Sequence, residues 1–263
     1  MIAALRAELV KVLRRRRVLI VTALTTAVFA VGSAAIVVAA AEPAGERVSG
    51  RGVTVATLSE AGGGSEVFAT AVSFAGSFLF VVFIGAVAVE FSRGTFRTML
   101  LHQPRRIRLL AGKLAALLAF AAAVLAAAEV LTWVAARLLA PSQDVATGQW
   151  ISADALGQGV ADYGSVLFWV SGYALLGTTL AILVRSVPIA LAIGIAWAGP
   201  FEHLLQDAWD PAQRFFPGLL LEAFVAGGTP SVSATRAFLT VSVYVIVAAA
   251  LGGTVFARRD MTA

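Results

Sequence analysis

The chain has 263 residues, of which 59% are hydrophobic and only 13% are charged, and its mean hydropathy is +0.88. Soluble domains carry roughly 25% charged residues, so this composition excludes an ordinary soluble protein and predicts an all-α integral membrane protein. The absence of cysteine excludes a disulfide framework and thiolate chemistry. The two histidines, His102 and His203, lie far apart in the sequence, and no metal site is expected.

Six segments are apolar enough to cross a membrane, since a spanning helix needs about 20 predominantly apolar residues. The first follows four consecutive arginines, which makes a signal peptide an alternative for it. Its 24 residues exceed the roughly 7–15 of a signal-peptide core, however, and favour a span. A single transmembrane domain over residues 1–263 is therefore expected, with spans at about 18–41, 67–89, 114–136, 165–184, 187–201 and 237–257.

Lys and Arg are unevenly distributed among the segments that connect these spans. Fifteen of the twenty lie in the N-terminus, in residues 90–113, at Arg185 and in the C-terminus, and five lie in the other connecting segments. Cytoplasmic segments carry the excess of Lys and Arg. Both termini are therefore expected in the cytoplasm, which agrees with an even number of spans.

The segments expected outside the cell differ in character. Residues 42–66 are polar and Gly-rich and predict a mobile loop, and residues 137–164 combine several aspartates with scattered apolar residues. Residues 202–236 contain the run FFPGLLLEAFVAGG, which is apolar but too short to span. A short re-entrant or interfacial helical segment is expected there, between Pro217 and the Gly227–Gly228 pair.

The N-terminal segment, residues 1–17, has one apolar stripe at helical spacing, formed by Ile2, Leu5, Leu9, Val12 and Leu13. An amphipathic helix of this kind can lie in the headgroup plane with its cations against anionic lipids. This pattern favours an in-plane cytoplasmic helix; a plain basic anchor before the first span is the alternative.

The segment EFSRGTFRTMLLHQPRRIRLLAGK, residues 90–113, gathers six basic residues between two apolar blocks. Ser92 is expected to cap a short helix and Pro104 to end it, because the proline ring blocks continuation. The residues of this helix form two groups: Arg93 and Arg97 one turn apart, and an apolar patch of Phe96, Met99 and Leu100. Two interpretations follow from the residues alone, a solvated loop helix and a docking surface for a partner.

This segment resembles the connection between the second and third spans of ABC-2 type transporter permeases, the membrane-spanning subunits of ABC exporters. The resemblance rests on a Glu at the end of a span, then a basic residue, Gly-Thr, a short helix, a Pro-x-x-Arg-like element and Gly-Lys. The matching positions are Glu90, Arg93, Gly94, Thr95, Pro104, Arg108, Gly112 and Lys113. The sequences LRAELVKVLRRRRVL at the N-terminus and FARRD near the C-terminus also resemble that family.

The resemblance implies a non-enzymatic permease in a bacterial plasma membrane. It implies a homodimer or heterodimer of permeases with two copies of a separate ABC ATP-binding protein, which would hold the ATP and Mg²⁺. This chain contains no G-x-x-x-x-G-K-[ST] motif of its own. Residues 91–104 would be the coupling helix, with Phe96, Met99 and Leu100 in a cleft of the ATPase and Arg93 and Arg97 against acidic groups at its rim. No nucleic-acid partner is expected.

Three polar features inside the apolar blocks have two interpretations each. Thr70, Ser73 and Ser77 share one face of the expected second span and would either line a pathway or bond a neighbouring helix. Glu129 is either a proton or substrate site or, as Trp133 and Arg137 favour, a residue near the outer interface. The Glu202–His203 pair favours a solvated interface position over a metal site.

Two other classes of function remain as alternatives. An ion-coupled secondary transporter needs paired ionisable groups inside the membrane, and Glu129 is the one available in the expected spans. A non-transporting scaffold would recruit a cytoplasmic partner through the basic segments. Substrate identity is not readable from the sequence, although the apolar residues 215–226 suggest amphipathic cargo that leaves near the outer leaflet.

Overall fold

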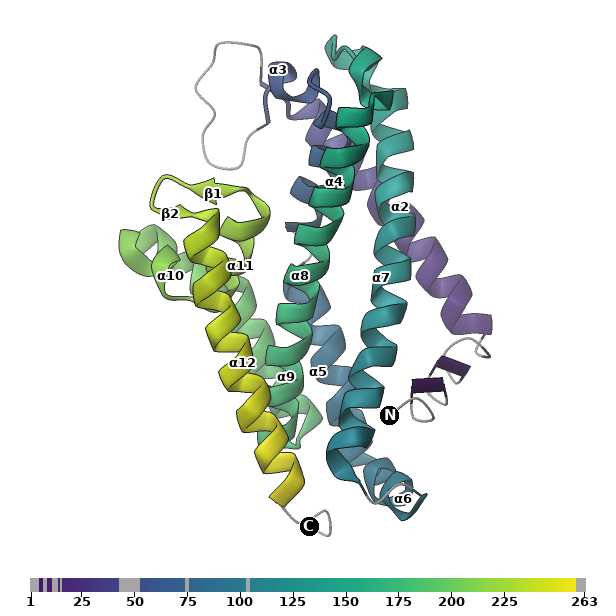
Figure 1. The fold of residues 1–263 in the computed structure, drawn as a ribbon, viewed down its shortest axis with the longest axis vertical. Coiled ribbons are helices and arrows are strands. Elements are labelled where there is room, and N and C mark those ends of the chain that lie inside the picture. The colour runs from purple at the N-terminus through teal and green to yellow at the C-terminus, as the bar shows by residue number, and fades with distance from the viewer. Residues whose placement is uncertain are drawn as a thin grey trace. The chain divides into compact units, whose positions relative to one another are not determined.

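The computed structural model describes residues 5–6, 9–10, 14, 16–42, 53–73, 76–102 and 105–258. The described part is helical except for short connections and one two-stranded hairpin (Figure 1). Four helical segments are long and apolar enough to cross a membrane, namely Leu19–Ala39, Arg106–Gln143, Ala153–Val184 and Ala234–Arg258. The chain is thus an α-helical, membrane-embedded protein, as its composition predicts.

The chain forms two compact units, and two helices contribute to both of them. The first unit consists of residues 12–74 and 120–167. Its helices are α2 (Arg16–Ala39), α3 (Val55–Leu58), α4 (Gly63–Ser73), the later part of α7 (Arg106–Leu139), η1 (Ala140–Gln143), η2 (Gly148–Ile151) and the start of α8 (Ala153–Val184).

The core of the first unit lies where α2, α4 and the end of α7 meet. Small and β-branched side chains pack there around Trp150, which is 2% exposed. The indole Nε1 of Trp150 donates a hydrogen bond to the carbonyl of Leu58 at 2.8 Å, so the one polar atom of this side chain is satisfied. The bond joins η2 to the end of α3.

Parts of two expected loops of the first unit are helical instead. Residues 62–65, expected in a mobile loop, are buried, and α4 begins at Gly63. Helix α8 begins at Ala153, well before the expected start at 165, and the hydroxyl of Ser152 accepts a hydrogen bond from the amide of Ala155 at 3.1 Å. Residues 43–52 lie outside the described part, as does most of the N-terminal segment on which the in-plane helix was predicted.

The second unit consists of residues 1–11, 75–119 and 168–263. It contains α5 (Gly76–Ser92), α6 (Thr95–His102), the start of α7, the end of α8, α9 (Val187–Ala196), η3 (Trp197–Phe201), α10 (Glu202–Ala208), η4 (Asp210–Arg214), α11 (Pro217–Val225), β1 (Gly228–Thr229), β2 (Val232–Ser233) and α12 (Ala234–Arg258). Helix α5 packs against α9, and α11 packs against α12.

Close helix approach in the second unit depends on glycine. A Cβ on Gly177 of α8 would lie 3.2 Å from side-chain atoms of both Ile84 and Phe80 on α5, and Gly194 of α9 faces the same two residues. Small residues at these positions let helices approach closely in an apolar environment.

Two expected spans contain more than one helical element. The described residues of the second, 67–89, belong to α4 and α5, which are assigned to different units, and residues 74–75 lie outside the described part. The fifth, 187–201, consists of α9 followed by the π-helix η3, which contains Pro200. Proline lacks an N–H and its ring clashes with the carbonyl four residues earlier, so the regular α-helical hydrogen bonds cannot continue through Pro200.

The expected helical segment before the last span is present as α10, α11 and the β1–β2 hairpin, at the N-terminal end of α12 (Figure 1). Pro217 is the first residue of α11, and Gly227 and Gly228 follow it with φ of +73° and +117°. Leu219, Leu220 and Leu221 are buried, so these residues stabilise the unit and do not present a surface to cargo. Glu202 is also buried, at 2% exposure, and the prediction of a solvated position for it was wrong.

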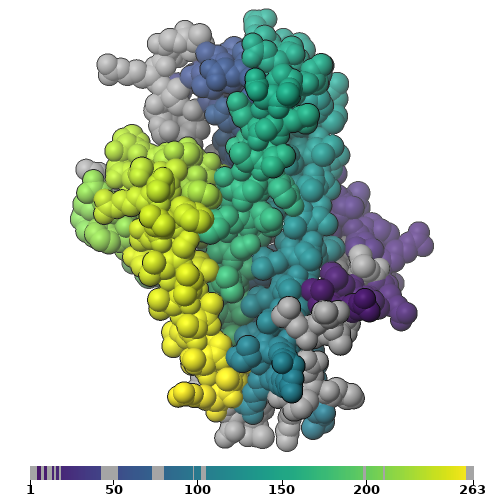
Figure 2. Space-filling view, viewed as in Figure 1, coloured from purple at the N-terminus to yellow at the C-terminus, as the bar shows by residue number. Residues whose placement is uncertain are grey.

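Large apolar side chains cover the outside of α12, which lies at the surface in Figure 2 (yellow). They are Phe238, Leu239, Val243, Ile246, Val247 and Leu251, each at least 39% exposed. An exposed apolar surface along a helix of 25 residues fits a lipid-facing span.

Candidate functional site

The basic segment at residues 90–113 forms a corner of the second unit made of the end of α5, the helix α6 and the start of α7. We call it the α5–α6–α7 corner. Helix α5 continues to Ser92, whose hydroxyl donates to the carbonyl of Ala88 at 3.3 Å. Ser92 therefore ends one helix and does not cap the next, which corrects the sequence-based prediction.

Gly94 makes the turn between α5 and α6. Its φ is +65°, a conformation that L-residues with a side chain rarely adopt, and its amide donates to the carbonyl of Phe91 at 3.1 Å. A Cβ here would meet no atom within 4 Å, so the backbone angle, and not crowding, requires glycine. The turn leaves α6 with eight residues, Thr95–His102, about 12 Å at 1.5 Å per residue. Pro104, expected to end this helix, lies outside the described part.

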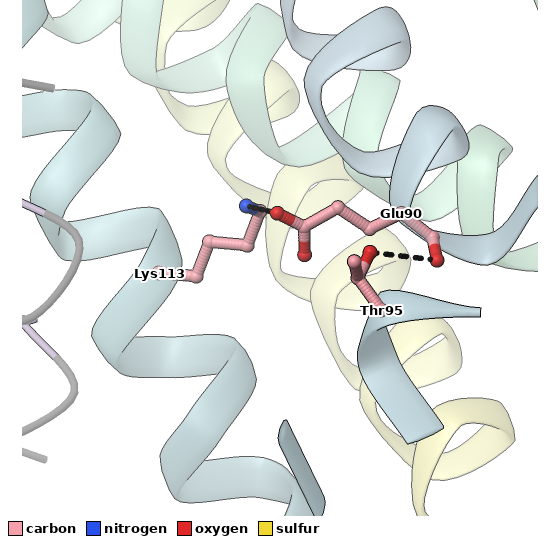
Figure 3. A network of polar contacts seen from close by, with 3 residues as sticks. All are labelled: Glu90, Thr95 and Lys113. Atoms are coloured by element: carbon pink, nitrogen blue, oxygen red, sulfur yellow. Dashed lines mark hydrogen bonds and ion pairs between the residues drawn. The ribbon is translucent and has the colours of Figure 1, made fainter. Parts of the chain in front are cut away.

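A buried ion pair fixes the corner (Figure 3). The Lys113 Nζ on α7 lies 2.5 Å from the Glu90 Oε1 on α5, and the two side chains are 5% and 9% exposed. The hydroxyl of Thr95, the first residue of α6, donates to the backbone carbonyl of Glu90 at 3.1 Å. One residue of α5 thus contacts both following helices.

An aromatic cluster also holds α6 in place. The ring of Phe96 packs on Phe91 of α5 and Phe256 of α12, with ring centroids 4.7 and 5.2 Å apart. Phe96 is 2% exposed, so its side chain is part of the core and is not available to a partner. The predicted docking patch is wrong at this residue.

Two arginines join the same corner to the rest of the second unit. The guanidinium of Arg185, directly after α8, lies over the Phe91 ring at 5.4 Å from its centroid. Arg106 donates from Nη1 to the carbonyl of Ala257 at 3.2 Å. The corner is therefore anchored to the end of α8, through Arg185, and to α12.

The outward surface of the corner combines one apolar side chain with exposed cations. Leu101 is 82% exposed, although apolar. Arg93, Arg105 and Arg108 are also exposed, while Met99 and Leu100 are half-buried. Arg97 belongs to α6, but its side chain is not among those that the structure describes. Such a surface fits an acidic partner with an apolar recess.

Sequence reasoning did not identify four of the residues that build this corner. Leu101 is three residues after Thr98 and four after Arg97, so helical spacing within α6 alone could have placed it on the polar face of this helix. The other three residues make contacts between distant parts of the chain, and the sequence contains no local signal for such contacts. They are Phe91, Phe256 and Arg185.

The polar residues expected to line a pathway lie on two different helices, α4 and α5. Thr70 is half-buried on α4, Ser73 is the last residue of α4, and Ser77 belongs to α5. Whether they share a face depends on residues 74–75, which lie outside the described part.

A second polar cluster lies in the first unit. Ser65 of α4 donates to Asp162 of α8 at 2.5 Å, and Asp162 interacts electrostatically with Glu66 and with the half-buried Glu129 of α7. Because α8 starts at Ala153, Asp162 lies within a helix long enough to span, which the sequence analysis did not expect. Among the described residues, no group of three or more His, Cys, Asp or Glu side chains could hold a metal ion.

Comparison with known proteins places this chain in no family, since neither a protein-family model nor a curated protein matches it.

Proposed function

We propose that this chain is the permease subunit of an ATP-driven exporter of the ABC-2 type, in a bacterial plasma membrane, with α6 as its coupling helix. The observation that carries the proposal is the construction of the α5–α6–α7 corner. A helix of eight residues is held by a buried ion pair and an aromatic core, and it presents an apolar tip among arginines. A loop that only fixed the orientation of the chain in the membrane would need the cations. It would need neither the buried ion pair nor the aromatic core.

The mechanism follows from the rigidity of this corner. Leu101 would enter an apolar recess of a separate ATP-binding subunit, and Arg93, Arg105 and Arg108 would pair with acidic groups around it. Movement of that subunit on ATP binding would be transmitted through the Glu90–Lys113 pair and Phe96 to α5, α7 and α12. Packed side chains and a buried ion pair transmit displacement because they resist deformation.

In this proposal the chain has six spans. Four are the long apolar helices, and the others are the α4–α5 region and the run from α9 through η3 to α10. Residues 187–208 are helical without interruption, about 33 Å at 1.5 Å per residue, enough for a membrane core of about 30 Å. Two copies of this chain and two ATP-binding subunits would form the transporter.

The test is co-purification with a P-loop ATPase encoded by a neighbouring gene. We expect Leu101→Asp and Arg93→Glu each to weaken binding by about tenfold or more, about 1.4 kcal/mol, because each removes a contact at the docking surface. Arg236→Glu, a matched charge reversal at an exposed residue of α12, should bind normally. Normal ATPase binding by both α6 variants would refute the assignment of α6.

A second candidate, an ion-coupled transporter, is favoured by one observation. Asp162 and Glu129 interact on two helices that are each long enough to span, which supplies the paired ionisable groups that this class requires. Transport assays on the same purified chain in liposomes separate the candidates. The permease should transport its substrate only with the ATPase and ATP. The alternative would be established if a proton gradient drove substrate uptake without the ATPase and if Asp162→Asn abolished that uptake.

A further inference from the structure

A patch of large apolar side chains lies on the outside of η3, α10 and the residues that follow them. Each member is at least 40% exposed, and the members are Trp197, Phe201, Leu204, Trp209 and Phe215. We call it the aromatic patch. The leucines of the neighbouring helix α11 are buried, so the aromatic patch is the apolar surface that the described part of this segment presents.

Contacts between rings make the aromatic patch continuous. Trp197 packs on Phe201 and on Phe216, with ring centroids 5.0 and 5.8 Å apart. Phe216 in turn contacts Trp209 at 6.5 Å. Trp209 stacks on Phe215 with centroids 5.8 Å apart and ring planes only 5° from parallel. One connected surface therefore extends from η3 to the residue after η4.

The aromatic patch continues an apolar stripe on α9. Ile189 and Ile193 are 56% and 43% exposed, and Trp197 and Phe201 follow them at the same four-residue spacing. Leu204 comes three residues later, so these side chains share one face of the helical run. In the proposed crossing by residues 187–208, an exposed apolar face of this kind meets lipid.

The chemistry of the surface changes at the end of this stripe. The stacked pair of Trp209 and Phe215 lies between the exposed charged residues Asp207 and Arg214 in the sequence. Tryptophan is typical of the membrane–water interface, because its large ring is apolar and its N–H is polar. An arginine at this level can bind lipid phosphate. Leu204 lies four residues before the end of α10, or about 6 Å farther into the membrane.

We propose that the Trp209–Phe215 pair anchors the chain in the headgroup region of a phospholipid bilayer, with Phe201 and Leu204 in the adjoining acyl region. Lipid is the occupant because the aromatic patch is continuous with the apolar face of α9 and ends in aromatic rings beside charges. The apolar face of an interfacial segment lies about 5–10 Å beyond the boundary between headgroups and acyl chains. This inference rests on the crossing by residues 187–208 in the proposed function, but it requires no ATPase.

The depth of single nitroxide labels tests the proposal, because the chain has no cysteine of its own. The full chain would be reconstituted in vesicles of phosphatidylcholine and phosphatidylglycerol with a label at Ile193→Cys, Leu204→Cys, Phe215→Cys or Ala226→Cys. Ala226 is exposed and lies outside the aromatic patch. Electron paramagnetic resonance then compares collisions of each label with oxygen, which concentrates in hydrocarbon, and with a water-soluble nickel complex.

The ratio of oxygen to nickel collisions should fall in the order Ile193, Leu204, Phe215, Ala226. A label at Leu204 or Phe215 that meets nickel as often as Ala226 does would overturn the proposal, because the patch would face water. Protection of these labels from both reagents would also overturn it and would indicate a protein partner, such as a second copy of the chain. The label at Ile193 tests the crossing itself, so a failure of the proposed span is distinguishable from a failure of the anchor.

Two double variants test whether the stacked pair acts as an anchor. Trp209→Ser with Phe215→Ser should move the Leu204 label toward water by about 5 Å, since the aromatic rings no longer bind the interface. Trp209→Tyr with Phe215→Tyr keeps amphipathic rings and should leave the label in place. Leu239→Ser, at a 58% exposed residue of α12, is the matched control and should not move it.

An unchanged depth of the Leu204 label in the double serine variant would refute the anchoring role. Circular dichroism checks that each variant keeps its helices. If the double serine variant does not fold, the depths of the four labels in the otherwise unchanged chain still decide whether the aromatic patch contacts lipid.

Discussion

Glu90 and Lys113 are charged residues in an apolar environment, and each offsets the free-energy cost of burying the other's charge. Both side chains are less than one-tenth exposed, and their charged atoms lie 2.5 Å apart. Removing two charges from water costs several kcal/mol per ion, which mutual attraction offsets only at such short distances. An ion pair of this kind need not raise the net stability of the fold. Replacing either residue alone, however, leaves a buried charge without a partner.

Lys113→Met should therefore destabilise the chain more than the loss of one contact suggests. We expect a loss of about 3–5 kcal/mol in the free energy of unfolding, because a buried carboxylate is left without its cation. The double variant Glu90→Leu with Lys113→Met removes both charges and should recover most of this loss. Unfolding of the detergent-solubilised variants measures both effects; equal stability of the single and double variants would contradict the argument.

Single residues also show which contacts can be predicted from the sequence and which cannot. The pairing of Glu90 with Lys113 and the turn at Gly94 lie within one short segment, where a motif can indicate proximity. Phe96 was assigned to a docking surface because it forms an apolar patch with Met99 and Leu100 on a short helix. Its actual partner Phe256 lies on the last helix, and no pattern within residues 90–113 reveals that contact.

At the scale of elements, the start of α4 shows how glycine determines a helix position. Residues 62–64 are three consecutive buried glycines. A Cβ on Gly63 would collide with the backbone carbonyl of Leu58, at the end of α3, and one on Gly64 would lie 2.5 Å from the indole of Trp133. The Gly-rich run that predicted a mobile loop instead allows α3, α4 and α7 to pack together.

We expect Gly63→Ala to destabilise the first unit by about 1–3 kcal/mol, because the backbone must shift to admit the methyl group. The matched control is Gly157→Ala on α8, where a Cβ meets nothing within 4 Å. Alanine there should be neutral or should stabilise by up to about 1 kcal/mol, since it restricts the unfolded chain. Thermal unfolding of both variants tests the difference, and equal effects would contradict it.

The element boundaries were predictable only where the composition changes abruptly. The edges of α11 coincide with Pro217 and the Gly227–Gly228 pair, as expected. The start of α8 was missed because residues 153–164 contain aspartates and glycines, which indicate a loop when tertiary contacts are unknown. The bond from Ser65 to Asp162 satisfies one of those polar groups inside the helical packing.

For the whole molecule, the distribution of charge and the lengths of the helices lead to different counts of spans. Four helices satisfy the length requirement without further argument. The excess of Lys and Arg in residues 90–113 places α6 in the cytoplasm only if the α4–α5 region crosses the membrane. The number of crossings before α6 therefore decides between six spans and four.

Cysteine accessibility distinguishes the two topologies, because the chain offers no background thiols. With six spans, an impermeant maleimide applied to intact cells whose plasma membrane is exposed should label Ser142→Cys after α7. It should not reach Thr98→Cys on α6 or Ser186→Cys before α9 until the cells are permeabilised. With four spans and a cytoplasmic N-terminus, Thr98 and Ser186 would be labelled and Ser142 protected. Since Thr98 lies on the exposed side of α6, its labelling in intact cells would also exclude a cytoplasmic ATPase as the partner of that helix.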